Sequence, residues 1–170
     1  IVQGDKAGDE CLAETLKAFI AQRDSKPGKV FMGIPHRLDR PVSGIVVFAK
    51  TSKALSRLSE MFRTGDIHKT YWALCLAAPP EESGERVDWL VRNEKMNKSF
   101  VTNNGKTTAG AKEARLLYKL IGSTERYHLI SVQLLTGRHH QIRCQLAAMG
   151  CVIKGDLKYG AQIGRASCRE

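Results

Sequence analysis

The sequence predicts an α+β fold with a mixed, mostly antiparallel sheet and flanking helices. Short runs of alternating apolar and polar residues, which are typical of half-buried strands, fill the middle of the chain. Runs with helical apolar spacing are fewer and do not alternate with the strands in a regular strand–helix–strand order. The 170 residues are 42% hydrophobic, which is enough to bury the core of one domain.

Two helices and one buried strand are predicted in the first part of the chain. The first helix runs from Asp9, its expected N-cap, to about Asp24. The strand covers 44–49, which is rich in β-branched residues. The second helix follows Thr51 or Ser52, either of which can cap it. The apolar faces of the two helices consist of Leu12, Leu16, Phe19 and Ile20, and of Leu55, Leu58, Met61 and Phe62.

The strands of the sheet are predicted further along the chain. The segment 69–76 alternates, with Tyr71, Ala73 and Cys75 on one side. Further strands are expected at 86–91, 99–102 and 127–135, with a polar turn at 93–97 between the first two. The segment 111–121 fits either a helix or a strand, and its neighbours favour a strand.

A last helix is predicted from about Arg138 to Met149, ended by Gly150 and capped by Thr136. In a helix, Arg138 and Gln141 would share a face near the N-terminus because they are three residues apart.

The charge of the chain favours a partner that carries phosphates. Lys and Arg number 27 against 17 Asp and Glu, a net charge of +10, although a soluble protein can be basic without binding nucleic acid. The five cysteines are odd in number and include no C-x-x-C pair, which argues against disulfides and a zinc site and favours the cytoplasm. Neither a membrane span nor a secretory signal is evident.

Both ends look incomplete or foreign. The chain does not begin with Met, so we expect a fragment, and residues 163–170 resemble a translated sequencing adapter. The expected domain therefore covers residues 1–162, with 163–170 as a non-native tail.

The segment 36–44, HRLDRPVSG, places Asp39 between Arg37 and Arg40. Neighbouring guanidinium groups would keep its carboxylate ionised, which suits nucleophilic work on a polyanion. The alternative is a structural salt bridge. The turn residues after it, followed at once by the apolar segment 44–49, favour a side chain held at the mouth of a cleft.

Two other segments carry possible chemistry. In 135–143, LTGRHHQIR, free N–H groups at a helix start and two arginines favour an anion, although a simple helix cap is an equal alternative. Adjacent His139 and His140 do not share a helix face, which argues against a metal site. In 69–73, Tyr71 could stack on a base or belong to the core.

Together, HRLDRPVSG, KTYWAL, LLTGRHHQIR and GDLKYG, in this order, resemble the RluA-type pseudouridine synthases. The resemblance covers about residues 3–161. It implies the pseudouridine synthase fold, truncated at both ends, with a central catalytic cleft that binds RNA. It also implies isomerisation of a uridine in structured ribosomal or transfer RNA, by a monomer that needs no metal or cofactor.

The resemblance further implies the roles of individual residues. Asp39 would be the nucleophile or base, Arg138 its charge partner, and Tyr71 the ring that packs against the flipped uracil, while Arg37 would enter the RNA stack. The remaining RNA-binding candidates are His36, Arg40, Lys69, His140, Gln141 and Arg143. Two alternatives remain, a catalytically inactive RNA-binding module and, with little support, a metal-dependent nuclease or phosphotransferase.

Overall fold

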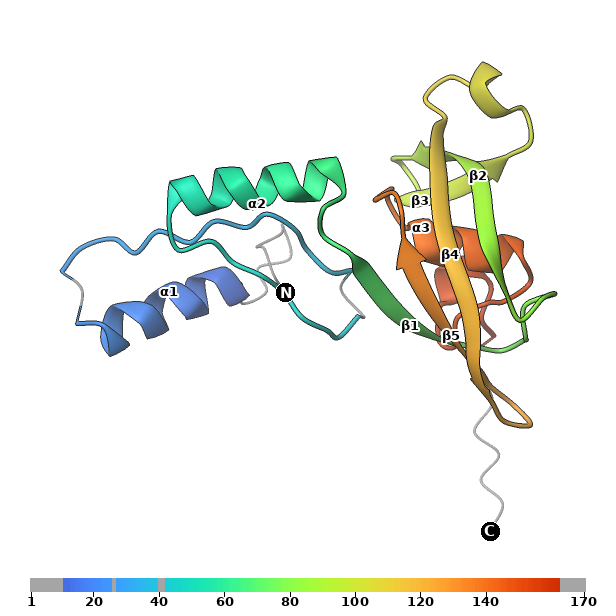
Figure 1. Cartoon of the computed structure of the whole chain (residues 1–170), viewed down its shortest axis with the longest axis horizontal. Coiled ribbons are helices and arrows are strands. Elements are labelled where there is room, and N and C mark those ends of the chain that lie inside the picture. The colour runs from blue at the N-terminus through green and yellow to red at the C-terminus, as the bar shows by residue number, and fades with distance from the viewer. Residues whose placement is uncertain (1–10, 26, 40–41, 163–170) are drawn as a thin grey trace, which may run out of the picture. The chain divides into compact units, whose positions relative to one another are not determined.

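The computed structural model describes residues 11–25, 27–39 and 42–162. The chain divides into two compact units, Ile1–Ile67 and His68–Glu170, which run from blue to green and from green to red in Figure 1. The expected tail, 163–170, lies outside the described residues. No helix among those described combines the length and apolarity needed to cross a membrane.

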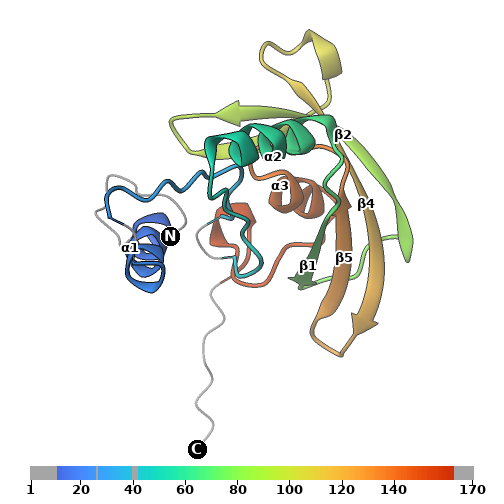
Figure 2. The ribbon, with the colours of Figure 1, turned by 60° about the vertical axis from the view of Figure 1, so that its left-hand side comes forward.

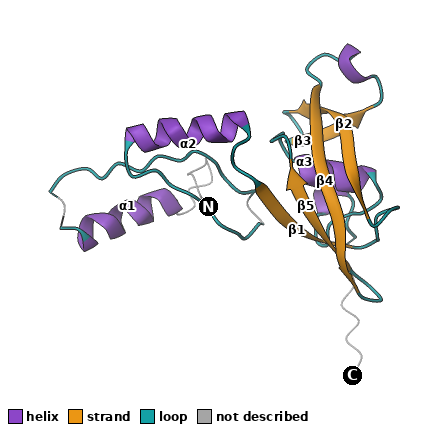
Figure 3. Ribbon diagram, in the orientation of Figure 1, coloured by secondary structure: helices purple, strands orange, loops and turns teal. Residues whose placement is uncertain are grey.

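The first unit contains both predicted N-terminal helices (Figure 3). Helix α1 spans Leu12–Arg23 with Cys11 at its N-cap, whereas Asp9, the expected cap, lies outside the described residues. Helix α2 spans Ser52–Thr64, and the Thr51 hydroxyl accepts a hydrogen bond from the Ala54 N–H at 3.1 Å. Thr51 is therefore the N-cap, as its sequence position predicts.

The buried strand predicted at 44–49 does not form. Its segment makes a single antiparallel bridge, between Ala49 and Gly33, and Ile45 is 87% exposed. A β-branched composition favours an extended chain, but a strand also needs a partner along its length, and the described residues supply one only at Ala49. Gly33 lies so close to α2 that a Cβ added there would be 2.9 Å from Cδ2 of Leu55.

The second unit contains an antiparallel sheet with the strand order β1-β5-β4-β2-β3. Its strands are β1 Lys69–Cys75, β2 Ser83–Asn93, β3 Lys98–Thr102, β4 Lys112–Ser123 and β5 His128–Leu134. The preference for a strand over a helix at 111–121 is confirmed by β4. The sheet is antiparallel at every described pairing, so the α+β prediction holds.

Helix α3, Gln141–Ala148, covers one face of this sheet (Figure 2). Four fully buried side chains form the centre of the core between them: Leu116, Ile130, Val132 and Leu146. On β1, Ala73 and Cys75 face this core, while Trp72 on the opposite face is 74% exposed. The alternation of β1 is therefore confirmed.

The start of α3 differs from the prediction. The helix begins at Gln141, not Arg138, and its N-cap is His140, which has a left-handed backbone (φ 51°). Thr136 does not cap the helix, because its hydroxyl is bonded to β4 and to Gln141. Arg138 therefore lies in the turn before the helix.

Candidate active site

The HRLD segment lies in the first unit, where Arg37 and Asp39 are both exposed. The Asp39 carbonyl accepts a hydrogen bond from the Val42 N–H at 3.0 Å. This hydrogen bond holds Val42 close to the backbone of Asp39. Arg40, an RNA-binding candidate, lies outside the described residues.

His36 ties this segment to the rest of its unit. Its Nε2 accepts a hydrogen bond from the Val47 N–H at 2.9 Å, and its ring lies 4.6 Å from that of Phe62 on α2. A ring nitrogen that accepts a hydrogen bond carries no hydrogen itself, so the proton of the neutral ring is on Nδ1. His36 therefore has a supporting role within its unit, and its predicted contact with RNA stays a prediction.

Lys69 and Tyr71 lie on one face of β1 in the second unit, paired with Leu134 and Val132 of β5. Tyr71 is half-buried. Its exposure therefore does not decide between the two predicted roles, a core residue and a ring that stacks on a base. The Lys69 ammonium lies against the turn before α3, where a Cβ added at Gly137 would be 3.7 Å from Nζ. The start of β1 thus brings a positive charge to the turn that carries Arg138.

Arg138 is exposed and is held at two points. Its Nε donates to the Glu113 carbonyl on β4 at 2.8 Å. Its backbone N–H donates to Oε1 of Gln141 at 2.9 Å, and the Gln141 N–H donates back to the Arg138 carbonyl at 3.1 Å. The side chain and the backbone of Arg138 are therefore both fixed to neighbouring elements.

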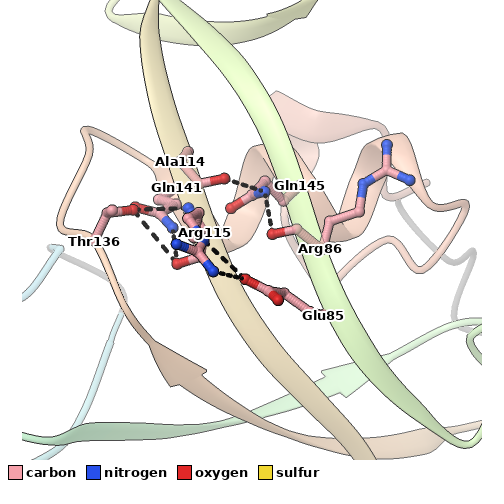
Figure 4. Close-up of polar contacts among 7 residues, drawn as sticks. All are labelled: Glu85, Arg86, Ala114, Arg115, Thr136, Gln141 and Gln145. Carbon is pink, nitrogen blue, oxygen red and sulfur yellow. Dashed lines mark hydrogen bonds and ion pairs between the residues drawn. The ribbon is translucent and has the colours of Figure 1, made fainter.

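Thr136, Gln141 and the backbone of Arg115 form a polar clamp beneath this turn, which we call the Arg115 clamp (Figure 4). The Thr136 hydroxyl accepts from the Arg115 N–H at 2.9 Å and donates to Gln141 Oε1 at 2.8 Å. Gln141 Nε2 donates to the Arg115 carbonyl at 3.0 Å. Gln141 is only 3% exposed, so its observed contacts support the turn, and its predicted contact with RNA stays a prediction.

Arg143, another RNA-binding candidate, forms a bidentate ion pair with Asp156. Nε and one terminal nitrogen each lie 2.7 Å from a carboxylate oxygen, and the two side chains are 16% and 7% exposed. Burial raises the pKa of the Asp156 carboxyl, but hydrogen bonds and charge from Arg143 outweigh it, so this pKa lies below its ordinary value. The Arg143 guanidinium therefore has an intramolecular partner.

His140 lies between this ion pair and Tyr159. Its Nε2 is 3.1 Å from a terminal nitrogen of Arg143, and its Nδ1 is 3.1 Å from the Tyr159 hydroxyl. A guanidinium can only donate, so Nε2 accepts and the proton of the neutral ring is on Nδ1. The Tyr159 hydroxyl also accepts from the Ser99 N–H at 2.8 Å, and burial raises the pKa of Tyr159 to about 12.

The structure gathers six predicted site residues within the second unit: Lys69, Tyr71, Arg138, His140, Gln141 and Arg143. His36, Arg37 and Asp39 belong to the first unit, so the expected pairing of Asp39 with Arg138 joins the two units and stays a prediction. No metal-binding cluster of His, Cys, Asp or Glu occurs among the residues that the structure describes.

Sequence reasoning missed the supports of the Arg138 turn. The GDLKYG motif contains Asp156 and Tyr159, and the resemblance gives neither a role, although a Tyr and an Asp in a short segment bounded by glycines are a usable signal. Arg115 and Glu113 gave no signal, because they act through backbone atoms that any residue carries.

Comparison with known proteins identifies the family. The model of the RNA pseudouridylate synthase family matches residues 1–148. The mitochondrial pseudouridylate synthase RPUSD4 of Xenopus tropicalis is 30% identical over 141 residues, covering 73% of this chain and 44% of the relative. The ribosomal large subunit pseudouridine synthase C of Vibrio cholerae is 34% identical over 143 residues, covering 84% and 44%. The chain thus spans less than half the length of these relatives.

A solved structure gives the same result for the fold. Human RNA pseudouridylate synthase domain containing 4 superposes with a TM-score of 0.77 at 26% identity, over 89% of this chain and 60% of that one. The family model covers the Asp39 segment, β1 and the Arg138 turn together. This chain belongs to the RNA pseudouridylate synthase family.

Proposed function

We propose that this chain supplies the catalytic residues of an enzyme that isomerises a uridine in structured RNA to pseudouridine. The observation that carries the proposal is the family match over residues 1–148, which includes Asp39, Tyr71 and Arg138 in one alignment. The net charge of +10 supports an RNA partner, because phosphates attract basic surfaces.

The reaction balances without an oxidant or reductant. The N1–C1′ bond breaks, the uracil turns, a C5–C1′ bond forms, C5 releases its proton and N1 gains one. The base must leave the helix before the enzyme can reach these atoms. Arg37, which is exposed beside Asp39, would offset part of the lost stacking by entering the gap.

Asp39 is the proposed reacting group, as a nucleophile at C1′ or as a base at C2′. Either role requires the carboxylate form of Asp39, whose negative charge a guanidinium would complement. Arg138 is the proposed partner, and its attachment to Glu113 and Gln141 supports a fixed position for the charge. Tyr71 would hold the detached ring during its rotation.

The substrate in this proposal is ribosomal or transfer RNA. The names of the Vibrio relatives mention the large ribosomal subunit, which favours ribosomal RNA as the first substrate to test. We further propose that the protein acts as a monomer in the cytoplasm and needs no cofactor.

Tritium release tests the activity directly. RNA labelled with tritium at uracil C5 loses the label to water when C5 bonds to C1′, so the full-length protein is expected to release tritium from ribosomal transcripts. Asp39→Asn keeps the side-chain volume but removes the charge, and is expected to reduce release at least about 10³-fold.

Asp66→Asn is the matched control, because Asp66 is an exposed carboxylate of the same unit. It should release tritium at the wild-type rate. Equal release by Asp39→Asn and wild type would contradict the role of Asp39. RNA binding without release by the wild-type protein would instead favour an RNA-binding module.

A further inference from the structure

Gln141 is unusual among the predicted site residues because it is buried, and both ends of its amide are bonded inside the protein. Its oxygen accepts from the Arg138 N–H at 2.9 Å and from the Thr136 hydroxyl at 2.8 Å. Its nitrogen donates to the Arg115 carbonyl at 3.0 Å. The side chain therefore connects the backbone of Arg138 to the first part of β4.

The backbone of Arg115 is itself held in place by further hydrogen bonds. The Arg115 carbonyl also accepts from the N–H groups of Leu135 and Thr136, at 3.1 and 3.2 Å. Arg115 itself lies in a strand paired on both sides, with Val87 of β2 and, through Leu116, with Leu134 of β5. A strand paired on both sides thus fixes the position of the turn through a connected set of hydrogen bonds.

We propose that Gln141 is a positioning residue, which fixes Arg138 for the reaction by holding the Arg138 backbone N–H to the Arg115 clamp. This inference rests on the proposed function of Arg138. It differs from the prediction that Gln141 binds RNA, because a side chain 3% exposed acts on the substrate only through the residue that it holds.

Gln141→Met tests the proposal, because Met keeps the length of the side chain and loses its hydrogen bonds. With tritiated ribosomal transcripts as the probe, we expect the single-turnover rate to fall about 10- to 100-fold, since misplacement by about 1 Å costs up to about 10²-fold. The Kd for the transcript should stay within about twofold. Gln141→Glu keeps an acceptor for the Arg138 N–H and should recover part of the lost rate.

Gln145→Met is the matched control. Gln145 is a fully buried Gln one turn further along α3. It donates to the Ala114 and Arg86 carbonyls (Figure 4) and to the Asp88 carboxylate, whereas Gln141 is the residue bonded to the Arg138 N–H. The Gln145→Met variant should have a melting temperature lowered by at least as much as that of Gln141→Met. Its single-turnover rate, measured on the folded protein, should equal that of the wild type. Equal losses of rate in the two variants would overturn the proposal in favour of general destabilisation.

Hydrogen exchange separates this inference from the proposed function. Gln141→Met should accelerate exchange of the amides in the segment 135–143, and of Arg138 in particular, whereas Gln145→Met should not. Unchanged exchange at Arg138, or a weakened Kd with an unchanged rate, would overturn the positioning role. If the wild-type protein releases no tritium, the proposed function fails, and the exchange rates still decide whether Gln141 holds Arg138.

Should Gln141→Met not fold, Thr136→Val serves the same purpose. It preserves the shape of Thr136 but removes the hydroxyl that donates to Gln141. We expect a smaller loss of rate in the same direction, with faster exchange at Arg138. No change in either quantity would overturn the proposal.

Discussion

The segments that carry Asp39 and Arg138 are supported in different ways. The turn that carries Arg138 rests on a five-stranded sheet and is bonded to β4 through backbone and buried side-chain groups. The segment that carries Asp39 lies in a unit whose described residues include only four buried ones: Ala13, Ile20, Gly33 and Ala49. Arg138, the proposed electrostatic partner, thus lies on a well-supported turn, and Asp39, the proposed reacting group, lies in a sparsely packed unit.

This contrast indicates where the free energy of folding resides. Apolar burial is the main favourable contribution to stability, and the fully buried large side chains of the described residues all lie in the second unit. We therefore expect the second unit to resist unfolding more strongly than the first. Comparable substitutions should therefore lower the free energy of unfolding more in the second unit than in the first.

Leu116→Ala should produce the largest loss of stability. Leu116 is fully buried in β4, and truncating such a residue costs about 2–5 kcal/mol through lost transfer energy and the cavity left behind. Leu58→Ala on α2, where the side chain is only half-buried, should cost about 1 kcal/mol. Chemical denaturation measures both, and equal losses would contradict the contrast between the units.

Asp156→Asn should come next, because it leaves the Arg143 charge without its carboxylate. Removing one partner of a buried ion pair costs about 3 kcal/mol. In the wild-type protein the pKa of Asp156 is lower when folded than when unfolded. The pair therefore contributes fully above the ordinary pKa of 3.8, and this contribution is lost as the pH falls through the lower, folded value.

Denaturation at several pH values checks this prediction. The difference in free energy of unfolding between wild type and Asp156→Asn should be constant near neutral pH and shrink below about pH 4. Asp66→Asn, at an exposed position, should lower the free energy of unfolding by much less than Asp156→Asn near neutral pH. A difference for Asp156→Asn that grows on acidification would show that the sign of the shift is wrong.

The sequence predicted the second unit well for physical reasons that the contrast also explains. Alternation in 69–76 and 127–135 reports burial on one face of a sheet, and the sheet forms there. The same reasoning failed at 44–49, because composition reports the tendency to extend but not whether a partner strand is present. It also failed at Thr136, whose hydroxyl had two possible uses, a helix cap or a bond to β4.

For the candidate site, the sequence proposed residues whose types suit the proposed chemistry, Asp39, Tyr71 and Arg138, and their roles stay predictions. It did not identify how they are held. The sequence makes Gln141 a candidate for binding RNA, but neither its burial nor its bond to the Arg115 carbonyl can be inferred from residue spacing. Every residue has a backbone carbonyl, so a tertiary hydrogen bond to that group does not require any particular residue type.

Thr51→Ala should have the smallest effect, and it probes the sparsely packed unit. The Thr51 hydroxyl accepts from the Ala54 N–H at the start of α2, and losing such a cap costs about 1 kcal/mol. Ser52→Ala, one residue inside the helix, should change stability by less than about 0.5 kcal/mol, because Ala has the higher helix propensity. Since the first unit buries few residues, loss of the cap should increase hydrogen exchange across α2 and leave β4 and β5 protected. Equal exchange in α2 of wild type and Thr51→Ala would mean that packing, and not the cap, sets the stability of this helix.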